Sequence, residues 1–544
     1  MLQCLTIFLE VTELEKRTVV LDGITLSTLD VHDVAHDYAV VAIAPEALVK
    51  VQTARDVVDR IVSGNEVVYG INTGFGSLVH TRIEQDDVEQ LQLNLIRSHA
   101  TGLGPVLSTQ VVRAMMCVRL NSLVKGHSGC HPDVVHQLSQ FINNGIHPVI
   151  PRIGSLGASG DLAPLSHLAC ALVGEGKVEF QGKIISAMEA IQQCELVPLT
   201  LKAKDGLSLI NGTSLITAML SLSIEQLRQL MTYADIVAGM SIDATESTLT
   251  PFDERIHKTR PHQGQLFVSS RMQYILSDSE ILHSHDDCNR VQDPYSFRCI
   301  PQVHGPVQET LQKLIATVSV ELNSSTDNPL IFPDAERPGA HEVVSQGNFH
   351  AEVLALVSDA MSLGLFELSS ISERRIDQML DPNRRAIRPF LAENPGLESG
   401  LMIVQYAAAA SLGELHGHCA PRTAFSTTTS AGQEDHVSMG ATASWNLFEA
   451  IQRCSEVIAC EAFVAHRAIK MIARKSSTCV ESMLRCMNQI IPERMEDRST
   501  SDEIIQIACE LRSSKWLSVI QSMLNSPLKK SYITFGFDMM HHDV

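Results

Sequence analysis

The chain has 544 residues, of which 44% are hydrophobic and 19% charged, a composition typical of soluble globular proteins and enough for two or three domains. Its formal net charge of −20 argues against nucleic acid as a partner, because phosphate contacts need clustered Lys and Arg. Thirteen cysteines without paired spacing favour reduced thiols, and no apolar run reaches the roughly 18 residues of a membrane span, so we expect a cytoplasmic protein with no membrane partner.

The amino-terminal part of the chain has a pattern of strands followed by helices. Residues 4–25 cluster β-branched residues around Asp22-Gly23, which predicts a short hairpin. A first strand is favoured over a signal peptide, because the apolar start has no basic segment and no small-residue cleavage site. Apolar periodicity then predicts helices over residues 45–63, 83–99, 109–125, 132–143 and 161–173.

The stretch Gly154–His167 reads Gly-Ser-Leu-Gly-Ala-Ser-Gly-Asp-Leu-Ala-Pro-Leu-Ser-His. Three small residues, Ala158, Ser159 and Gly160, stand between a glycine-punctuated loop and Asp161, which opens the next predicted helix. The loop therefore ends at the positive pole of a helix. By itself, an Ala-Ser-Gly sequence is typical of an ordinary turn with an acidic cap.

Further polar residues in the middle of the chain, at 211–212 and 292–298, are candidates for a site. Asn211-Gly212 precedes a long apolar-periodic helix to about residue 235. Gln292, Tyr295 and Arg298 recur at every third residue, so one helical turn would aim all three in the same direction. An arginine among polar and aromatic neighbours suits a bidentate grip on a carboxylate, although a solvated loop explains the pattern equally well.

Two further long helices are predicted in the second half. Phe349 precedes a helix to about residue 380, and a core aromatic explains this residue when it is taken alone. Ser430–Met439 opens a helical stretch to about residue 474, with Gln433 and Glu434 near its start. Acidic residues are common in the first turn of a helix, so Glu434 also has a structural explanation.

In their order and identity these motifs resemble those of the ammonia-lyase and aminomutase family that builds a 4-methylidene-imidazol-5-one (MIO) group from its own Ala-Ser-Gly. In that family the glycine nitrogen closes onto the alanine carbonyl carbon, and loss of two waters turns the serine into an exocyclic methylidene. The resemblance runs from about Tyr69 to Met439. It implies that Ala158, Ser159 and Gly160 form the electrophile, with no exogenous cofactor and no metal.

The resemblance implies catalytic roles for further residues. Tyr69, in a glycine-rich loop, would be the general base, which requires its site to ionise a phenol whose pKa is normally near 10. Asn211 and Tyr295 would serve the electrophile and the departing amine. Phe349 would pack against the MIO ring, and Arg298 would bind the substrate carboxylate.

Specificity depends on His99 and Glu434 in this resemblance. Histidine-specific members carry Gln-Glu-Asp-His, as Gln433-Glu434-Asp-His does here, whereas members acting on phenylalanine or tyrosine tend to place an amide at the glutamate. Members acting on tyrosine also carry histidine at the position of His99. With Gln292 in a matching Gln-Asp-Pro-Tyr-Ser-x-Arg-Cys, the resemblance implies deamination of L-histidine to trans-urocanate and ammonia. A lyase or aminomutase for tyrosine or another aromatic amino acid, and an inactive scaffold, are the alternatives.

The implied fold is mainly α and ammonia-lyase/fumarase-like. A smaller amino-terminal domain over residues 1–225 would carry the MIO loop, and a central and carboxy-terminal bundle of long helices would occupy residues 226–544. The family assembles as a homotetramer with shared active sites. The sequence departs from the family before residue 40 and in the His-Asp-rich loop 283–288, for which we expect no metal because no distant ligand is apparent.

Overall fold

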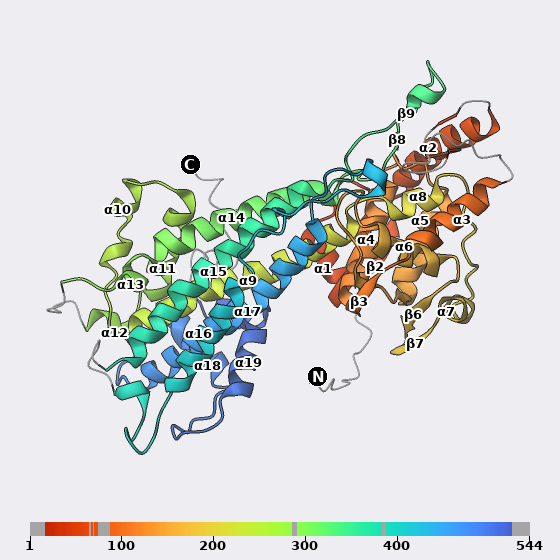
Figure 1. The fold of residues 1–544 in the computed structure, drawn as a ribbon. Helices are drawn as coiled ribbons and strands as arrows, with labels where there is room; N and C mark the ends of the chain where they lie inside the picture. The colour runs from red at the N-terminus through yellow and green to blue at the C-terminus, as the bar shows by residue number, and fades with distance from the viewer. Residues whose placement is uncertain are drawn as a thin grey trace. The chain divides into compact units, whose positions relative to one another are not determined.

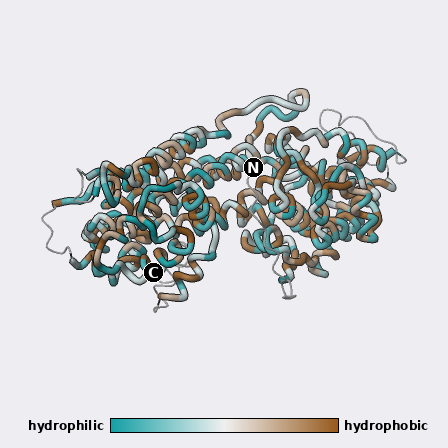
Figure 2. Tube along the Cα trace, turned by 90° about the horizontal axis from the view of Figure 1, so that it is seen from below, coloured by the Kyte–Doolittle hydropathy of each residue, from teal (hydrophilic) through white to brown (hydrophobic). Residues whose placement is uncertain are grey.

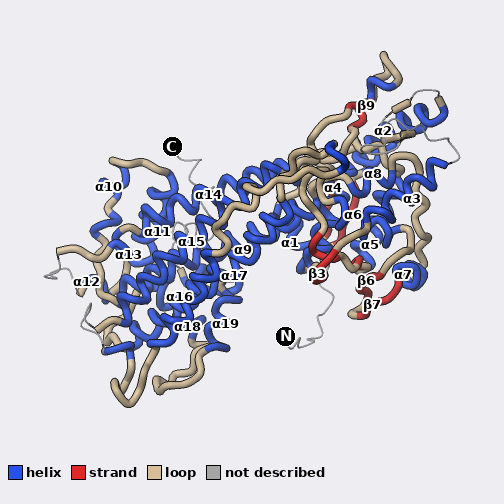
Figure 3. The backbone as a smooth tube through the Cα atoms, in the orientation of Figure 1, coloured by secondary structure: helices blue, strands red, loops and turns tan. Residues whose placement is uncertain are grey.

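The structure is a computed structural model, and it describes residues 17–64, 67–68, 70–73, 87–284, 291–382 and 388–524. Helices dominate these residues and the strands are few and short (Figure 3). The chain divides into two compact units: the first comprises residues 1–222, 319–351 and 427–437, and the second comprises residues 223–318, 352–426 and 438–544. This differs from the expected division at residue 225 in that two later segments join the first unit.

The first unit contains the strands found in the described residues and the helices α1 to α8 (Figure 1). The strands form four small sheets, ordered β1-β2, β3-β5, β4-β6-β7 and β8-β9. Their bounds are β1 Thr18–Leu21, β2 Val40–Ile43, β3 Leu103–Val106, β4 His147–Pro148, β5 Pro151–Ile153, β6 Lys177–Phe180, β7 Lys183–Ser186, β8 Leu330–Ile331 and β9 Val343–Val344. The helices are α1 Thr28–His36, α2 Pro45–Ser63, α3 Val88–His99, α4 Thr109–Val124, α5 Pro132–Asn144, α6 Leu162–Leu172, α7 Ala187–Gln193 and α8 Asp205–Ile210.

The predicted hairpin around Asp22-Gly23 is wrong. β1 pairs in parallel with β2, with Thr18 opposite Val40, and α1 forms the crossover between the two strands. The Asp22 carboxylate accepts the backbone N–H groups of Ile24 and Thr25 at 2.7 and 2.8 Å, so the turn is satisfied locally without a returning strand. A capping box at Ser27 then begins α1.

The second unit is a bundle of helices. The long helix α9, Ser214–Ala244, begins in the first unit and continues into the second. α15 packs against both α16 and α17. The remaining helices are α10 Glu254–Lys258, α11 Gln263–Leu276, α12 Glu280–His283, α13 Tyr295–Arg298, α14 Ile300–Leu322, α15 Glu352–Leu380, α16 Met402–His416, α17 Gly440–Lys470, α18 Thr478–Met487, α19 Ser501–Glu510 and α20 Lys515–Met523.

Hydrophobic and hydrophilic residues alternate along the helices of both units, as amphipathic packing requires (Figure 2). α15 has the length and apolar composition of a membrane span, but 61% of the residues in its apolar window are buried inside the protein. A buried core helix passes the same test, so α15 is weak evidence for a membrane. The cysteines in the described part of the chain are all free thiols, as their spacing predicted.

A buried ion pair joins three helices of the second unit. Arg375 of α15 forms hydrogen bonds to both carboxylate oxygens of Glu461 in α17, at 2.5 and 2.8 Å, and both side chains are almost fully buried. Ser241 of α9 and Ser372 of α15 donate to the same carboxylate at 2.6 and 2.5 Å. Because every oxygen lone pair of this glutamate is used, the network fixes the relative positions of the three helices.

Replacing Glu461 by glutamine should leave the Arg375 guanidinium buried without a counter-charge, at a cost of about 3–5 kcal/mol. We expect a large fall in the thermal midpoint of Glu461→Gln. The matched control is Glu254→Gln, which breaks the exposed Glu254–Lys258 pair of α10 and should cost about 0–1 kcal/mol. Equal midpoints for the two variants, measured by circular dichroism, would contradict this account.

Candidate active site around Ser159

Three segments that are distant in sequence meet at Ser159. Its hydroxyl donates to Oε1 of Glu434 at 2.5 Å, and its carbonyl oxygen accepts a hydrogen bond from Nδ2 of Asn211 at 2.9 Å. The second carboxylate oxygen of Glu434 accepts from the hydroxyl of Thr429 at 2.7 Å. The structure therefore brings together three of the residues that the sequence predicted for the site, all within the first unit.

The backbone of Gly160 lies against that of Gly212. Gly160 has φ +72°, and a Cβ built on it would stand 2.1 Å from the carbonyl oxygen of Gly212. The two residues form an isolated parallel bridge, and the N–H of Asp161 donates to that same carbonyl oxygen at 2.8 Å. Only glycine satisfies both the positive φ and the close approach, so the loop carrying Ser159 is pressed onto the turn that carries Asn211.

Asp161 links this loop to α9. Its carboxylate is fully buried and accepts the N–H groups of Leu215 and Ile216, in the first turn of α9, at 2.8 and 3.2 Å. The hydroxyl of Ser155 donates to the other oxygen at 2.8 Å. Burial raises the pKa of Asp161 to about 6, although these hydrogen bonds oppose the shift. The sequence placed Asp161 at the start of α6, and the structure shows that its carboxylate caps α9.

A buried arginine that the sequence analysis did not single out lies behind the loop. All three guanidinium nitrogens of Arg119 in α4 are buried and have no hydrogen-bond partner among the described residues. Burial lowers the pKa of Arg119, whereas the nearby carboxylates of Asp327 and Asp161 favour its charged form. A Cβ built on Gly212 would stand 2.7 Å from Nη1 of Arg119, so this cation lies directly at the turn. Nothing in the sequence around Arg119 marks it as different from other helical arginines.

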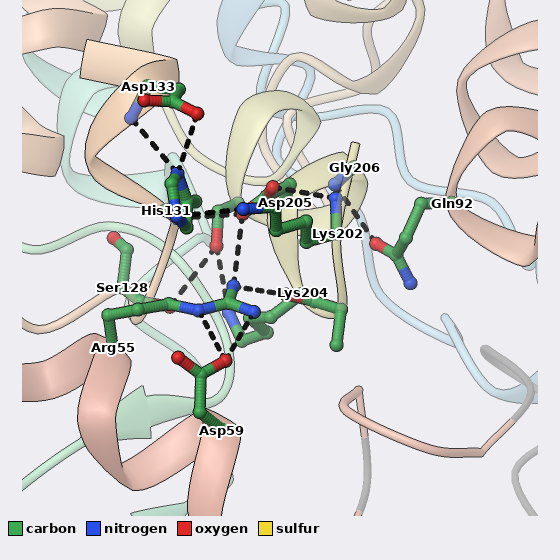
Figure 4. A network of polar contacts seen from close by, with 12 residues as sticks. Arg55, Asp59, Gln92, Ser128, His131, Asp133, Lys202, Lys204, Asp205 and Gly206 are labelled. Carbon is green, nitrogen blue, oxygen red and sulfur yellow. Dashed lines mark hydrogen bonds and ion pairs between the residues drawn. The ribbon is translucent and has the colours of Figure 1, made fainter. Parts of the chain in front are cut away.

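A polar network holds the short helix α8, which ends at Asn211 (Figure 4). Asp205, the first residue of α8, accepts the backbone N–H groups of His131 and Lys202, each at 2.8 Å. Arg55 donates to the carbonyl oxygen of Ala203 at 2.8 Å, and the side chain of Gln92 accepts the N–H of Gly206 at 2.9 Å. Contacts from α2 and α3 thus fix the orientation of α8 and, with it, the position of Asn211.

Glu434 is held by a tight turn and not by a helix. The sequence predicted a helical stretch from Ser430, but α17 begins only at Gly440. Thr429 and Glu434 pair through backbone hydrogen bonds, with the N–H of Thr429 2.8 Å from the carbonyl oxygen of Glu434. A positive φ at Ala431 closes this turn, which turns Glu434 toward Ser159 and leaves Gln433 exposed.

The segment after Phe349 also contacts the loop. The N–H of Ala351 donates to the carbonyl oxygen of Gly157 at 3.0 Å, and Phe349 itself is half-buried. His99 lies in the last turn of α3, where its Nδ1 is 2.9 Å from the carbonyl oxygen of Leu95. Among the described residues, no hydrogen bond joins His99 to Ser159. Tyr69 lies outside the described residues.

Gln292, Tyr295 and Arg298 belong to the second unit. The guanidinium of Arg298 lies over the ring of Tyr295, 4.6 Å from its centroid, and its Nε is buried without a hydrogen-bond partner among the described residues. The sequence predicted one helical turn that holds Gln292, Tyr295 and Arg298. The turn holds only Tyr295 and Arg298, because α13 starts at Tyr295 and the exposed Gln292 precedes it. The carbonyl oxygen of Ser296 accepts from Nη1 of Arg375 at 3.3 Å, so the Arg375–Glu461 pair also anchors α13.

The surroundings of Ala158-Ser159-Gly160 fit an MIO group. MIO formation requires the glycine nitrogen to approach the alanine carbonyl carbon, and a residue without a Cβ leaves the backbone free for this approach, while Gly160 also packs tightly on Gly212. The amide of Asn211 already binds the Ser159 oxygen, while its own Oδ1 is buried without a partner among the described residues. Asn211, Asp161 and the Gly212 backbone are the groups that would hold MIO.

Comparison with known proteins agrees with this geometry. A model of the aromatic amino acid lyase family matches residues 26–489. The chain is 40% identical over 512 residues to histidine ammonia-lyase from Bacillus subtilis, covering 94% of this chain and 99% of the relative.

Solved structures of two such enzymes are also similar to this chain. Histidine ammonia-lyase from Trypanosoma cruzi is similar with a TM-score of 0.87 and 35% identity, over 95% of this chain and 98% of that chain. Tyrosine aminomutase from Streptomyces globisporus is similar with a TM-score of 0.88 and 32% identity, over 94% and 100%. These similarities define an enzyme with a mainly α lyase fold, as the sequence predicted. The chain belongs to the aromatic amino acid lyase family.

The raised pKa of Asp161 predicts a pH-dependent stability. The folded state keeps the proton up to a pKa of about 6, whereas the unfolded chain releases it near 3.8, so this group makes the protein less stable as pH rises through that window. Asp161→Asn removes the titration. We expect its stability relative to the wild type to improve by about 2 kcal/mol between pH 4 and pH 7.

Thermal or urea midpoints at several pH values measure this difference. The control is Asp56→Asn on the exposed face of α2, whose difference from the wild type should stay nearly constant with pH. A pH-independent difference for Asp161→Asn would show that the carboxylate is not destabilised by burial.

Proposed function

We propose that the protein deaminates L-histidine to trans-urocanate and ammonia, using an MIO group made from Ala158, Ser159 and Gly160. The observation that carries this proposal is the hydrogen bond between Glu434 and Ser159, because it puts a carboxylate at the reacting position. Relatives named histidine ammonia-lyase, at 40–45% identity over most of the chain, support the choice of substrate.

The MIO group would supply an uncharged carbon electrophile, which ordinary side chains do not provide. Asn211 holds the oxygen of residue 159 by N–H donation and stabilises negative charge that develops there. The charge of Arg119, which lies near the carboxylates of Asp327 and Asp161 and makes no hydrogen bond among the described residues, would act in the same direction from behind the turn.

Glu434 would select the substrate side chain. In the structure its Oε1 accepts the Ser159 hydroxyl, and its Oε2 accepts the hydroxyl of Thr429. Loss of the serine hydroxyl when MIO forms frees Oε1, while Thr429 keeps the carboxylate oriented. The freed oxygen can then accept an imidazole N–H, a charge-assisted hydrogen bond that a phenyl ring cannot make. We propose that His99 binds the imidazole together with Glu434.

The remaining roles follow the family pattern. Arg298 binds the substrate carboxylate, with Gln292 beside it, and Tyr69 takes the proton from the β-carbon. Tyr295 assists the departing amine. We propose that the protein is a cytoplasmic homotetramer in which residues of several subunits complete each active site, and that it binds neither nucleic acid nor membrane.

The second candidate function is an MIO-dependent lyase or aminomutase acting on tyrosine or another aromatic amino acid. Its support is the TM-score of 0.88 to a tyrosine aminomutase. An aminomutase returns the amine to the β-carbon, so chiral analysis of the product distinguishes it from a lyase. Glu434 favours histidine over phenylalanine, because a phenyl ring offers no hydrogen-bond donor to a carboxylate, whereas tyrosine can donate its phenol O–H and must be compared by assay.

Ser159→Ala should abolish turnover, because alanine has no hydroxyl to lose and cannot give the methylidene. Urocanate absorbs near-ultraviolet light that histidine does not, so the assay is direct. Intact-mass measurement should show the wild type lighter than its sequence by two waters, and the variant without this deficit. Undiminished turnover by Ser159→Ala, or a wild type with no deficit, would refute the proposed electrophile.

Glu434→Gln should lower kcat/KM for histidine by about 10- to 100-fold, because it removes a hydrogen bond to a charged acceptor worth about 1.5–3 kcal/mol. Activity with tyrosine or phenylalanine should not fall in parallel. The matched control is Asp435→Asn, which removes the adjacent exposed carboxylate and should leave kcat/KM unchanged. Intact mass must first show that both variants have lost two waters. Equal kcat/KM for Glu434→Gln and the wild type would overturn the substrate assignment.

A further inference from the structure

A pocket lies in the second unit, between the carboxy-terminal end of α17 and the segment that joins α18 to α19. Its volume is about 210 Å³. The α17 side contributes residues at helical spacing, which therefore share one face of the helix. The pocket is lined by, among others, Phe463, His466, Arg467, Lys470, Arg494 and Arg498. None of them belongs to the proposed active site.

The positive charges of this pocket are poorly compensated. Arg467 is 6% exposed, and within the described part of the chain its guanidinium donates to two carbonyl oxygens, those of Leu391 at 3.0 Å and of Met495. No carboxylate of the described residues forms an ion pair with Arg467, Lys470 or Arg494. Arg498 alone is paired, to Glu503 at 2.8 Å. Four cations thus face one lining acid in a chain whose net charge is −20.

Three acidic residues, Glu398, Asp497 and Glu393, act on the charge of Arg467, and the first two also accept backbone N–H groups. Asp497 accepts the backbone N–H groups of Ser399 and Gly400 at 2.7 and 3.0 Å. Glu398 accepts the N–H groups of Glu393 and Asn394 at 3.0 and 2.9 Å. These carboxylates stabilise the loop before α16, so they attract Arg467 only from a distance.

His466 does not add to the positive charge. Its Nε2 is 2.9 Å from Oδ1 of Asn488, and burial together with Lys470, Arg498 and Arg467 lowers its pKa to about 4. The imidazole is therefore neutral at physiological pH, and the cations around it set the field. Burial is the largest cause of this shift, and the three cations add to it.

We propose that this pocket binds a small organic phosphate. Arg467, Lys470 and Arg494 offer donors from two sides to the three terminal oxygens of a phosphate group, whereas a carboxylate has only two oxygens. The ring of Phe463, over which Arg498 lies at 5.9 Å, provides an apolar wall for the organic part. The volume is below the roughly 300–1,000 Å³ of pockets for drug-sized ligands, so the ligand is small.

The test is isothermal titration calorimetry of the full chain with inorganic phosphate, phenyl phosphate and benzoate, at constant ionic strength set with sodium chloride. The variant Lys470→Ala/Arg494→Ala removes two cations that carry no ion pair within the described residues. The matched control, Arg255→Ala/Lys258→Ala, removes the same charge from the exposed helix α10. Thermal midpoints equal to that of the wild type show that the variants are folded, and Lys470→Ala alone replaces the double variant if it unfolds.

We expect phenyl phosphate to bind more tightly than inorganic phosphate, and the pocket variant to weaken its affinity by about tenfold or more, as the loss of charge-assisted hydrogen bonds predicts. The control should stay within about twofold of the wild type. Absence of heat with either phosphate, benzoate binding as tight as that of phenyl phosphate, or equal weakening in both double variants would each overturn the proposal.

Discussion

The contact between the backbones of Gly160 and Gly212 is the constraint on which the candidate site depends. A Cβ at Gly160 would stand 2.1 Å from the Gly212 carbonyl oxygen, so no other residue fits without moving one of the two segments. The contact puts Ser159 within hydrogen-bond reach of Asn211, and Asp161 within reach of the first turn of α9. The loop of residues 158–160 is thereby held by the first turn of α9, the turn at Gly212 and the buried carboxylate of Asp161.

Buried charge is concentrated behind this contact. Asp161 is fully buried and Arg119 has no hydrogen-bond partner among the described residues, an arrangement that costs stability and is retained in the fold. The second unit contains a buried pair as well, Arg375 with Glu461, but there every oxygen is satisfied. Both oxygens of Asp161 are hydrogen-bonded too, so the group at the candidate site that differs from the Arg375–Glu461 pair is the Arg119 guanidinium.

The charges of the carboxy-terminal pocket follow a third pattern. Around Arg467 the acids are bound to backbone N–H groups and the cations line an open volume. In a protein of strongly negative net charge, this pocket is thus lined by four cations and one acid, Glu493. The pocket and the Ser159 site are built from different segments, so substitutions at one can be examined with the other intact.

The sequence by itself determined the features that depend on local contacts. Helices such as α2 and α5 begin and end where periodicity, Pro and Gly placed them, because caps and apolar faces are set within a few residues. The family, the mainly α fold and the Ala-Ser-Gly loop were also evident from the motifs. Only the tertiary structure decided how β1 pairs, that the turn at Thr429 carries Glu434 to Ser159, and that Asp161 caps α9. Those outcomes depend on contacts with residues tens or hundreds of positions away. These contacts compete with local conformational preferences, and a short window of sequence does not include them.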